Sequence, residues 1–187
     1  MPAKDDLQQA RERLTILLAQ QGNREAFSKL VDLYDQRLLY FVRRILGETD
    51  GALDVLQSVW LTVHRKLGKL KSLDAFRVWL YRIAHDQAVS HLRRKSKRPL
   101  SIEEVETIQG VDDASAKAAA FENAELVHIA LQGLSVDHRR ALTLRFLEDM
   151  TIEEIAEVVG CSPGTVKSRL HYAKIALRRR IEDLTDE

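Results

Sequence analysis

The segment TIEEIAEVVGCSPGTVKSRLHYAK, which begins at Thr151, constrains the fold of this chain more than any other stretch. Thr151 and Glu154 form a capping-box pattern, which is typical of a helix start. Apolar residues follow at helical spacing: Ile152, Ile155, Ala156 and Val159. Gly160 predicts a turn, and Ser162 followed by Pro163 is typical of a second helix start. The segment therefore predicts two short helices joined by a tight turn, which is the helix-turn-helix pattern.

The second of these helices is predicted to have a basic face. Its apolar stripe consists of Val166, Leu170, Ala173 and Leu177, which leaves Lys167, Ser168, His171 and Lys174 outward. These four side chains can donate hydrogen bonds to phosphates and base edges. A packed helical hairpin without a DNA-binding role is the alternative. Residues 165–181 contain no carboxylate, and Arg178, Arg179 and Arg180 extend the basic character, so the pattern favours DNA binding.

Composition excludes several other classes of protein. No apolar run approaches the roughly 20 residues needed to span a membrane, and the charged N-terminus lacks the apolar core of a signal peptide. A single cysteine, Cys161, rules out an internal disulfide and fits a cytoplasmic location. We interpret it as a small buried residue. The six histidines lack ligand-like spacing, so no metal and no cofactor is expected.

Charge is segregated along the chain, although the net charge is only +1. Residues 1–100 carry 19 Lys/Arg and 11 Asp/Glu, a balance of +8. Residues 101–125 carry one Lys and seven carboxylates, a balance of −6, and residues 126–187 have a balance of −1. This pattern indicates separate working parts.

The first half of the chain shows helical periodicity. Three apolar stripes predict three helices: Phe27, Leu30, Val31, Tyr34, Leu38, Phe41, Val42 and Ile45; then Leu53, Leu56, Val59, Trp60 and Val63; then a helix from about Phe76 to Lys95. No alternating strand pattern is visible, so the predicted class is all-α. Periodicity lapses after Ser96 and resumes near Glu122. We divide the chain into a helical extension (1–23), a helical domain (24–98), a flexible acidic linker (99–121) and a helix-turn-helix domain (122–187).

The helix from Phe76 continues as FRVWLYRIAHDQAVSHLRRKSKR and combines aromatic residues with a basic tail. Trp79, Leu80 and Ile83 are expected to pack inward. The remaining polar, basic and aromatic side chains are expected to face outward: Arg77, Tyr81, Arg82, His85, Asp86, Ser90, Arg93 and Arg94. Aromatic and basic side chains together suit unpaired bases and a phosphate backbone. A solvated basic helix end is the alternative interpretation.

Taken together, these residues resemble RNA polymerase sigma factors of the extracytoplasmic-function (ECF) type. The resemblance extends from about Arg24 to Ile181. It rests on DVLQSVW (from Asp54), on FRVWLYRIA (from Phe76), on LSVDHRRALTLRFLEDMTIEEIAEVVGCSPGTVKSRL (from Leu134), and on their spacing. It implies a non-enzymatic factor that directs core RNA polymerase to promoters and helps to melt them.

The resemblance also implies a role for each part. Asp54, Gln57 and Ser58 would contact the polymerase β′ clamp, and the C-terminal domain would meet the β flap. The melted promoter element would be held by Lys69, Lys71, Ser72, Arg77, Tyr81, Arg82, His85, Asp86, Arg93 and Arg94. The upstream duplex would be read by Lys167, Ser168, Arg169, His171, Tyr172 and Lys174. An anti-sigma factor or a Ser/Thr kinase is a further expected partner.

Three residues depart from the family pattern. The family commonly has Glu at Ser58, Asn at Asp86 and often Arg at Tyr172. Ser58 is therefore a candidate phosphorylation site, because a phosphate would restore the missing anion. Asp86 places a negative charge beside the expected DNA path, and Tyr172 weakens the transfer of any specific upstream contact.

Two other functions are alternatives to this one. A helix-turn-helix regulator that binds duplex DNA without polymerase explains residues 134–181 but leaves the aromatic-basic helix without a role. An enzyme is disfavoured because the sequence shows no glycine-rich phosphate loop, nucleophile motif or metal cluster.

Overall fold

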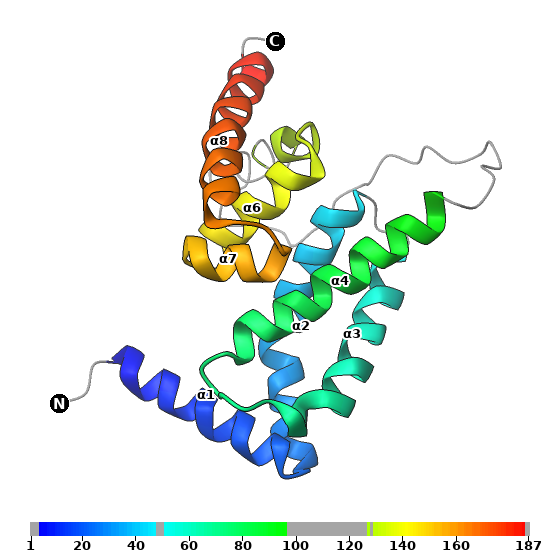
Figure 1. Cartoon of the computed structure of the whole chain (residues 1–187), viewed down its shortest axis with the longest axis vertical. Helices are drawn as coiled ribbons and strands as arrows, with labels where there is room; N and C mark the ends of the chain where they lie inside the picture. Colours follow the sequence, from blue (N-terminus) through cyan, green and yellow to red (C-terminus); the bar gives the residue numbers. More distant parts are fainter. Residues whose placement is uncertain (1–3, 48–50, 97–126, 128, 186–187) are drawn as a thin grey trace, which may run out of the picture.

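The computed structural model describes residues 4–47, 51–96, 127 and 129–185, and every regular element in this part of the chain is a helix (Figure 1). The N-terminal unit contains α1 (Lys4–Gln20), α2 (Arg24–Leu46), α3 (Ala52–Lys66), the 3-10 turn η1 (Leu67–Lys69) and α4 (Phe76–Ser96). The C-terminal unit contains α6 (Val136–Phe146), α7 (Ile152–Val159) and α8 (Pro163–Thr185). The predicted all-α class is confirmed. The predicted linker, 99–121, lies outside the described residues.

α2 lies at the centre of the N-terminal unit because its apolar residues recur on one face at helical spacing. Six residues of the predicted stripe are buried there: Leu30, Tyr34, Leu38, Phe41, Val42 and Ile45. Asn23 caps the helix through its side-chain oxygen, which accepts from the backbone N–H of Ala26, and Gly47 ends it in the left-handed conformation. The stripe predicted for α3 was wrong at Leu53, which is 62% exposed.

α4 is packed on more than one side. Leu80 is fully buried, as predicted, and Trp79 and Ile83 are half-buried. Tyr81 and His85 were expected to face outward, but both are buried. The Tyr81 ring packs edge to face against Phe41 of α2, with the ring centroids 5.3 Å apart. His85 is covered by Arg140 of α6, because the C-terminal unit also packs on this helix (Figure 1).

The C-terminal unit contains the predicted helix-turn-helix, and its helix boundaries follow from the predicted caps. Thr151 and Glu154 form both hydrogen bonds of the capping box at the start of α7. Gly160 ends α7 with a φ of 68°, a conformation that favours glycine. Ser162 caps α8, because its hydroxyl accepts from the backbone N–H of Thr165 at 3.1 Å. Three residues of the predicted α8 stripe are buried: Val166, Leu170 and Ala173.

α1 braces the N-terminal unit from outside. The phenol of Tyr34, on α2, donates to the Glu12 carboxylate. The side-chain amide of Gln20 donates to two backbone carbonyls, those of Leu67 (3.1 Å) and Leu70 (2.8 Å). Both carbonyls belong to the connection between α3 and α4. α1 therefore restrains the connection in which part of the melted-DNA site was predicted.

Candidate nucleic-acid interface

α8 presents an exposed polar face opposite its buried stripe. Five of the residues predicted to read duplex DNA are exposed on it: Lys167, Ser168, His171, Tyr172 and Lys174. The Ser168 hydroxyl donates to the carbonyl of Gly164 at 3.2 Å, one turn earlier. The rings of His171 and Tyr172 meet edge to face, with their centroids 5.3 Å apart. The face can therefore offer cationic, hydroxyl and imidazole groups to a DNA groove without disturbing the core.

Arg169 is less exposed than the other five residues predicted to read duplex DNA. Its side chain is 25% exposed and forms an ion pair of 2.6 Å with the Asp137 carboxylate on α6. It also donates to the sulfur of Cys161 at 3.7 Å. Cys161 is half-buried in the turn, where it packs against the core. In this conformation Arg169 therefore joins α8 to α6.

The connection between α3 and α4 carries exposed polar groups that were predicted to hold the melted promoter element. Lys69, Lys71 and Ser72 are all exposed. Asp74, in the same connection, forms a solvent-exposed ion pair of 3.4 Å with Arg13 of α1. Such exposed ion pairs contribute little stability. The two partly buried hydrogen bonds of Gln20 are therefore the stronger restraint on this connection.

The predicted DNA-binding residues of α4 fall into two sets. Arg82, Asp86, Arg93 and Arg94 are exposed. The other three contact or face the C-terminal unit: Arg77, Tyr81 and His85. The exposed set can meet nucleic acid in this conformation, whereas Tyr81 and His85 cannot.

Comparison with known proteins decides the family. Residues 30–98 match the model of Sigma-70 region 2, and residues 124–177 match that of Sigma-70 region 4. The chain is 33% identical to the RNA polymerase sigma-H factor of Pseudomonas aeruginosa, over 97% of this chain and 99% of that protein. It is 30% identical to the ECF RNA polymerase sigma-E factor of Escherichia coli K12, over 95% of this chain and 97% of that protein. The chain belongs to the ECF sigma factors.

Solved structures show the same fold. CnrH, solved in complex with the cytosolic domain of CnrY, gives a TM-score of 0.63 at 24% identity and covers 94% of this chain and 97% of CnrH. The sigma factor RpoE from Bartonella quintana, solved with the anti-sigma factor NepR, gives 0.66 at 23% identity and covers 83% of this chain and 96% of that one. This sigma factor is thus an alternative factor that directs RNA polymerase to promoters, as predicted.

In region 2 of the sigma factor, α3 exposes the three residues predicted to contact polymerase. Asp54, Gln57 and Ser58 all lie on its solvent face. Leu53 and Leu61 are 62% and 57% exposed on the same face, four residues before and after Gln57. An exposed helix face that combines large apolar groups with polar groups is typical of a protein-binding surface.

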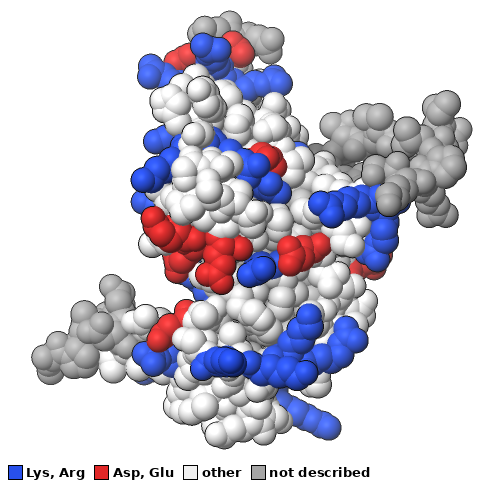
Figure 2. Space-filling view, in the orientation of Figure 1, with Lys and Arg blue, Asp and Glu red and all other residues white. Residues whose placement is uncertain are grey.

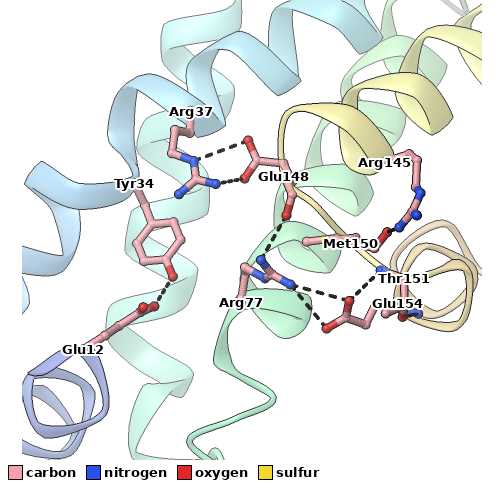
Figure 3. A network of polar contacts seen from close by, with 9 residues as sticks. All are labelled: Glu12, Tyr34, Arg37, Arg77, Arg145, Glu148, Met150, Thr151 and Glu154. Atoms are coloured by element: carbon pink, nitrogen blue, oxygen red, sulfur yellow. Dashed lines mark hydrogen bonds and ion pairs between the residues drawn. The ribbon is translucent and has the colours of Figure 1, made fainter. Parts of the chain in front are cut away.

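Region 2 and region 4 are joined by a buried carboxylate (Figure 3). Glu148, in the turn between α6 and α7, is 3% exposed and forms an ion pair of 2.6 Å with Arg37 of α2. The backbone carbonyl of Glu148 accepts from Arg77 of α4 at 2.9 Å, and Arg77 also reaches the Glu154 carboxylate at 3.4 Å. Burial raises the pKa of the Tyr81 phenol, and the neighbouring Glu148 carboxylate raises it further.

A second set of contacts between the two regions is centred on His85. Arg140 of α6 donates to Nε2 of His85 at 2.9 Å, and Arg140 also pairs with Asp137 at 2.6 Å. Because arginine only donates, Nε2 is the acceptor, and the proton lies on Nδ1, which faces Asp86 at 3.2 Å. Burial and the Arg140 guanidinium lower the pKa of His85, against the opposing effect of Asp86 and Asp137. The imidazole is therefore neutral in this contact.

The sequence reasoning missed three residues that connect the regions: Arg37, Arg140 and Glu148. Each is a charged residue in a helix or turn, and no spacing or motif distinguishes it from a solvated surface group. Within the described ranges, no helix is long and apolar enough to cross a membrane. The same residues contain no group of three His, Cys, Asp or Glu side chains that could hold a metal ion.

Proposed function

We propose that this ECF sigma factor binds the β′ clamp of core polymerase with the exposed face of α3 and reads the upstream promoter element as duplex DNA with α8. The observation that carries this division is the exposed face of α8, from Lys167 to Lys174. It displays donors on a helix-turn-helix whose apolar stripe is already packed. A face without carboxylates between residues 165 and 181 suits a DNA groove and a phosphate backbone.

The melted promoter element is held, in this proposal, by region 2. Lys69, Lys71 and Ser72 supply exposed polar groups, and Arg82, Arg93 and Arg94 extend the basic surface along α4. Arg77, Tyr81 and His85 join the site when region 4 moves away. Region 4 also contacts the β flap of polymerase. Two kinds of support underlie these roles: the family resemblance and the exposure of the side chains.

A protein that silences the factor is a further part of the proposal. CnrH and RpoE were each solved with a second protein, the cytosolic domain of CnrY and the anti-sigma factor NepR, respectively. In the present chain the exposed leucines of α3, Leu53 and Leu61, offer apolar area that such a partner could cover. Ser58 lies exposed between them, which makes it accessible to a kinase as the other candidate regulator.

The test is reconstituted transcription. The purified chain is mixed with core polymerase, examined for co-elution in gel filtration, and used for run-off transcription on fragmented genomic DNA with mapping of the 5′ ends. We expect co-elution and a small set of start sites that share an upstream element. If the chain fails to co-elute but binds specific duplex DNA tightly by itself, it acts as a free-standing helix-turn-helix regulator instead.

A further inference from the structure

Two buried arginines from different regions lie near each other where α6 packs beside the end of α2 (Figure 1). Arg44, in the last turn of α2, is 4% exposed, and Arg139, near the start of α6, is 9% exposed. The guanidinium carbon of Arg44 lies 4.4 Å from the centroid of the Tyr40 ring. Burial lowers the pKa of Arg139, and the positive charge of Arg44 lowers it further. Each cation therefore disfavours the other.

Among the residues that the structure describes, no anion partners the Arg139 guanidinium. Its Nε atom is buried without a hydrogen-bond partner, and no described carboxylate forms an ion pair with it. Asp137, the one acidic residue of α6, pairs with Arg140 and Arg169 instead. Figure 2 shows acidic side chains gathered over α7, the helix that packs on α4. A buried cation without an anion is costly, so the site is suited to an anion that binds from outside.

The end of α2 leaves room for such an anion beside Gly47. The Nη2 and Nη1 atoms of Arg139 lie 3.6 and 3.7 Å from the position that a Cβ atom on Gly47 would occupy. Gly47 is the left-handed C-cap of α2 and is exposed, so the missing side chain leaves this edge of the guanidinium open. The carbonyl groups at a helix end carry roughly half an elementary negative charge. That partial charge offsets only a part of two guanidinium charges.

We propose that Arg44 and Arg139 bind a small phosphate-bearing anion between region 2 and region 4. Phosphate suits the site because the planar fork of a guanidinium can donate to two phosphate oxygens at once. A phosphate group carries about −1.5 to −2 charges at pH 7, which matches two guanidinium groups. The source is either free inorganic phosphate or the phosphates of a nucleotide. One arginine from each region holds the anion, so its binding joins α2 to α6.

Isothermal titration calorimetry of the full-length chain with sodium phosphate, at constant ionic strength, measures this binding directly. Arg139→Gln is the test variant, because it removes the charge and keeps a side chain that favours helix. Arg65→Gln is the matched control, because Arg65 is an exposed arginine on α3, outside the proposed site. Thermal unfolding followed by circular dichroism, with and without phosphate, reports the folding and the stability of each chain.

We expect the wild type and Arg65→Gln to bind one phosphate per chain, and Arg139→Gln to bind it at least about tenfold more weakly. Phosphate at about ten times its Kd should favour the folded wild type about tenfold. For a chain of this size, that effect raises the Tm by about 3–6 °C. Without phosphate, Arg139→Gln should melt at least as high as the wild type, because the variant lacks the buried cation.

Equal phosphate binding by the wild type and Arg139→Gln would overturn the inference, because the ligand then occupies another basic surface. The absence of saturable binding to the wild type would overturn it as well. Competition with ATP separates the two sources: displacement of phosphate by ATP indicates a nucleotide, and retention of phosphate indicates the free ion. If Arg139→Gln fails to fold, Arg139→Lys decides, since its ammonium group lacks the guanidinium fork and should bind phosphate more weakly than the wild type.

Discussion

Gln20 offers the sharpest test of how α1 supports promoter opening. Its side-chain amide donates to the carbonyls of Leu67 and Leu70, and it is the one α1 side chain described here that bonds the backbone of this connection. Residues 67–75 connect α3 to α4 and include Lys69, Lys71 and Ser72. Replacing Gln20 by Ala removes both hydrogen bonds while keeping a residue that favours helix at the end of α1.

The two bonds are not equivalent. The Leu67 carbonyl also accepts from the backbone N–H of Leu70 at 3.0 Å, so it keeps a partner in the variant. The Leu70 carbonyl loses its bond from Gln20, although Leu70 is half-exposed and water can replace the amide in part. At about 0.5–1.5 kcal/mol per net hydrogen bond, the combined loss is about 1–2 kcal/mol. That corresponds to an increase of about 5- to 30-fold in the local opening of the connection.

Hydrogen exchange measured by mass spectrometry on peptides that span residues 67–76 checks this value. Gln8→Ala serves as the control, because it makes the same substitution on the same helix at an exposed position. Permanganate footprinting with core polymerase should show less promoter opening for Gln20→Ala, with upstream binding unchanged. Exchange equal to that of the control would refute the restraint, and faster exchange with normal opening would remove the connection from the melted-strand site.

Three further predictions concern other parts of the molecule. Lys167→Ala and His171→Ala should each reduce discrimination between upstream elements by about 1–3 kcal/mol per lost base contact, measured by run-off transcription on promoters with altered upstream sequences. Asp183→Ala on the same helix is the control, and equal use of every sequence by wild type and variants would mean that α8 is oriented differently. Ser58→Glu and the phosphorylated chain should bind a β′ clamp fragment more tightly than the unmodified chain, by about 1.5–3 kcal/mol for a charge-assisted bond. If all forms bind equally, Asp54 and Gln57 are sufficient for clamp binding, and phosphorylation of Ser58 does not regulate it. Finally, the contact between region 2 and region 4 should loosen as the pH falls below about 6.5, the ordinary pKa of histidine. Contact with region 4 lowers the pKa of His85, so the contact is favoured while His85 is neutral. Protonation places a second cation against Arg140, and Asp86 and Asp137 compensate for it in part. Scattering at a series of pH values should show this expansion for the wild type, and His85→Gln should be insensitive to the same change.

The helix-turn-helix was predictable almost residue by residue because its signals are local. A cap, a glycine turn and an apolar stripe each depend on neighbours within about one or two helical turns, and these neighbours are visible in the sequence. Thr151, Gly160 and Ser162 therefore marked the boundaries that the structure shows. The exposure of the α8 face followed directly, since burial of one stripe determines which side chains remain outside.

The buried side chains of α4 were harder to predict because two different surfaces pack against this helix. A helix with a single buried side shows a clean stripe, whereas on α4 the Tyr81 ring packs against Phe41 of region 2 and His85 contacts Arg140 of region 4. Polar residues such as His85 look like surface groups until a partner from a distant segment is known. Leu53 gave the opposite error, because an apolar residue at helical spacing was assigned to the core although it lies on the exposed face of α3.

The polar contacts between region 2 and region 4 differ in chemistry from the packing within region 2. Within region 2, α2, α3 and α4 bury large side chains such as Phe41 and Tyr34, and each such burial contributes about 1.5–3 kcal/mol that is insensitive to salt. The prominent polar contacts between region 2 and region 4 are instead charged, through Glu148 with Arg37, Glu154 with Arg77, and Arg140 with His85. Ion pairs return much of their energy as solvation when they separate. These charged contacts therefore orient region 4 on region 2, beside the apolar residues of both regions that form one continuous buried cluster.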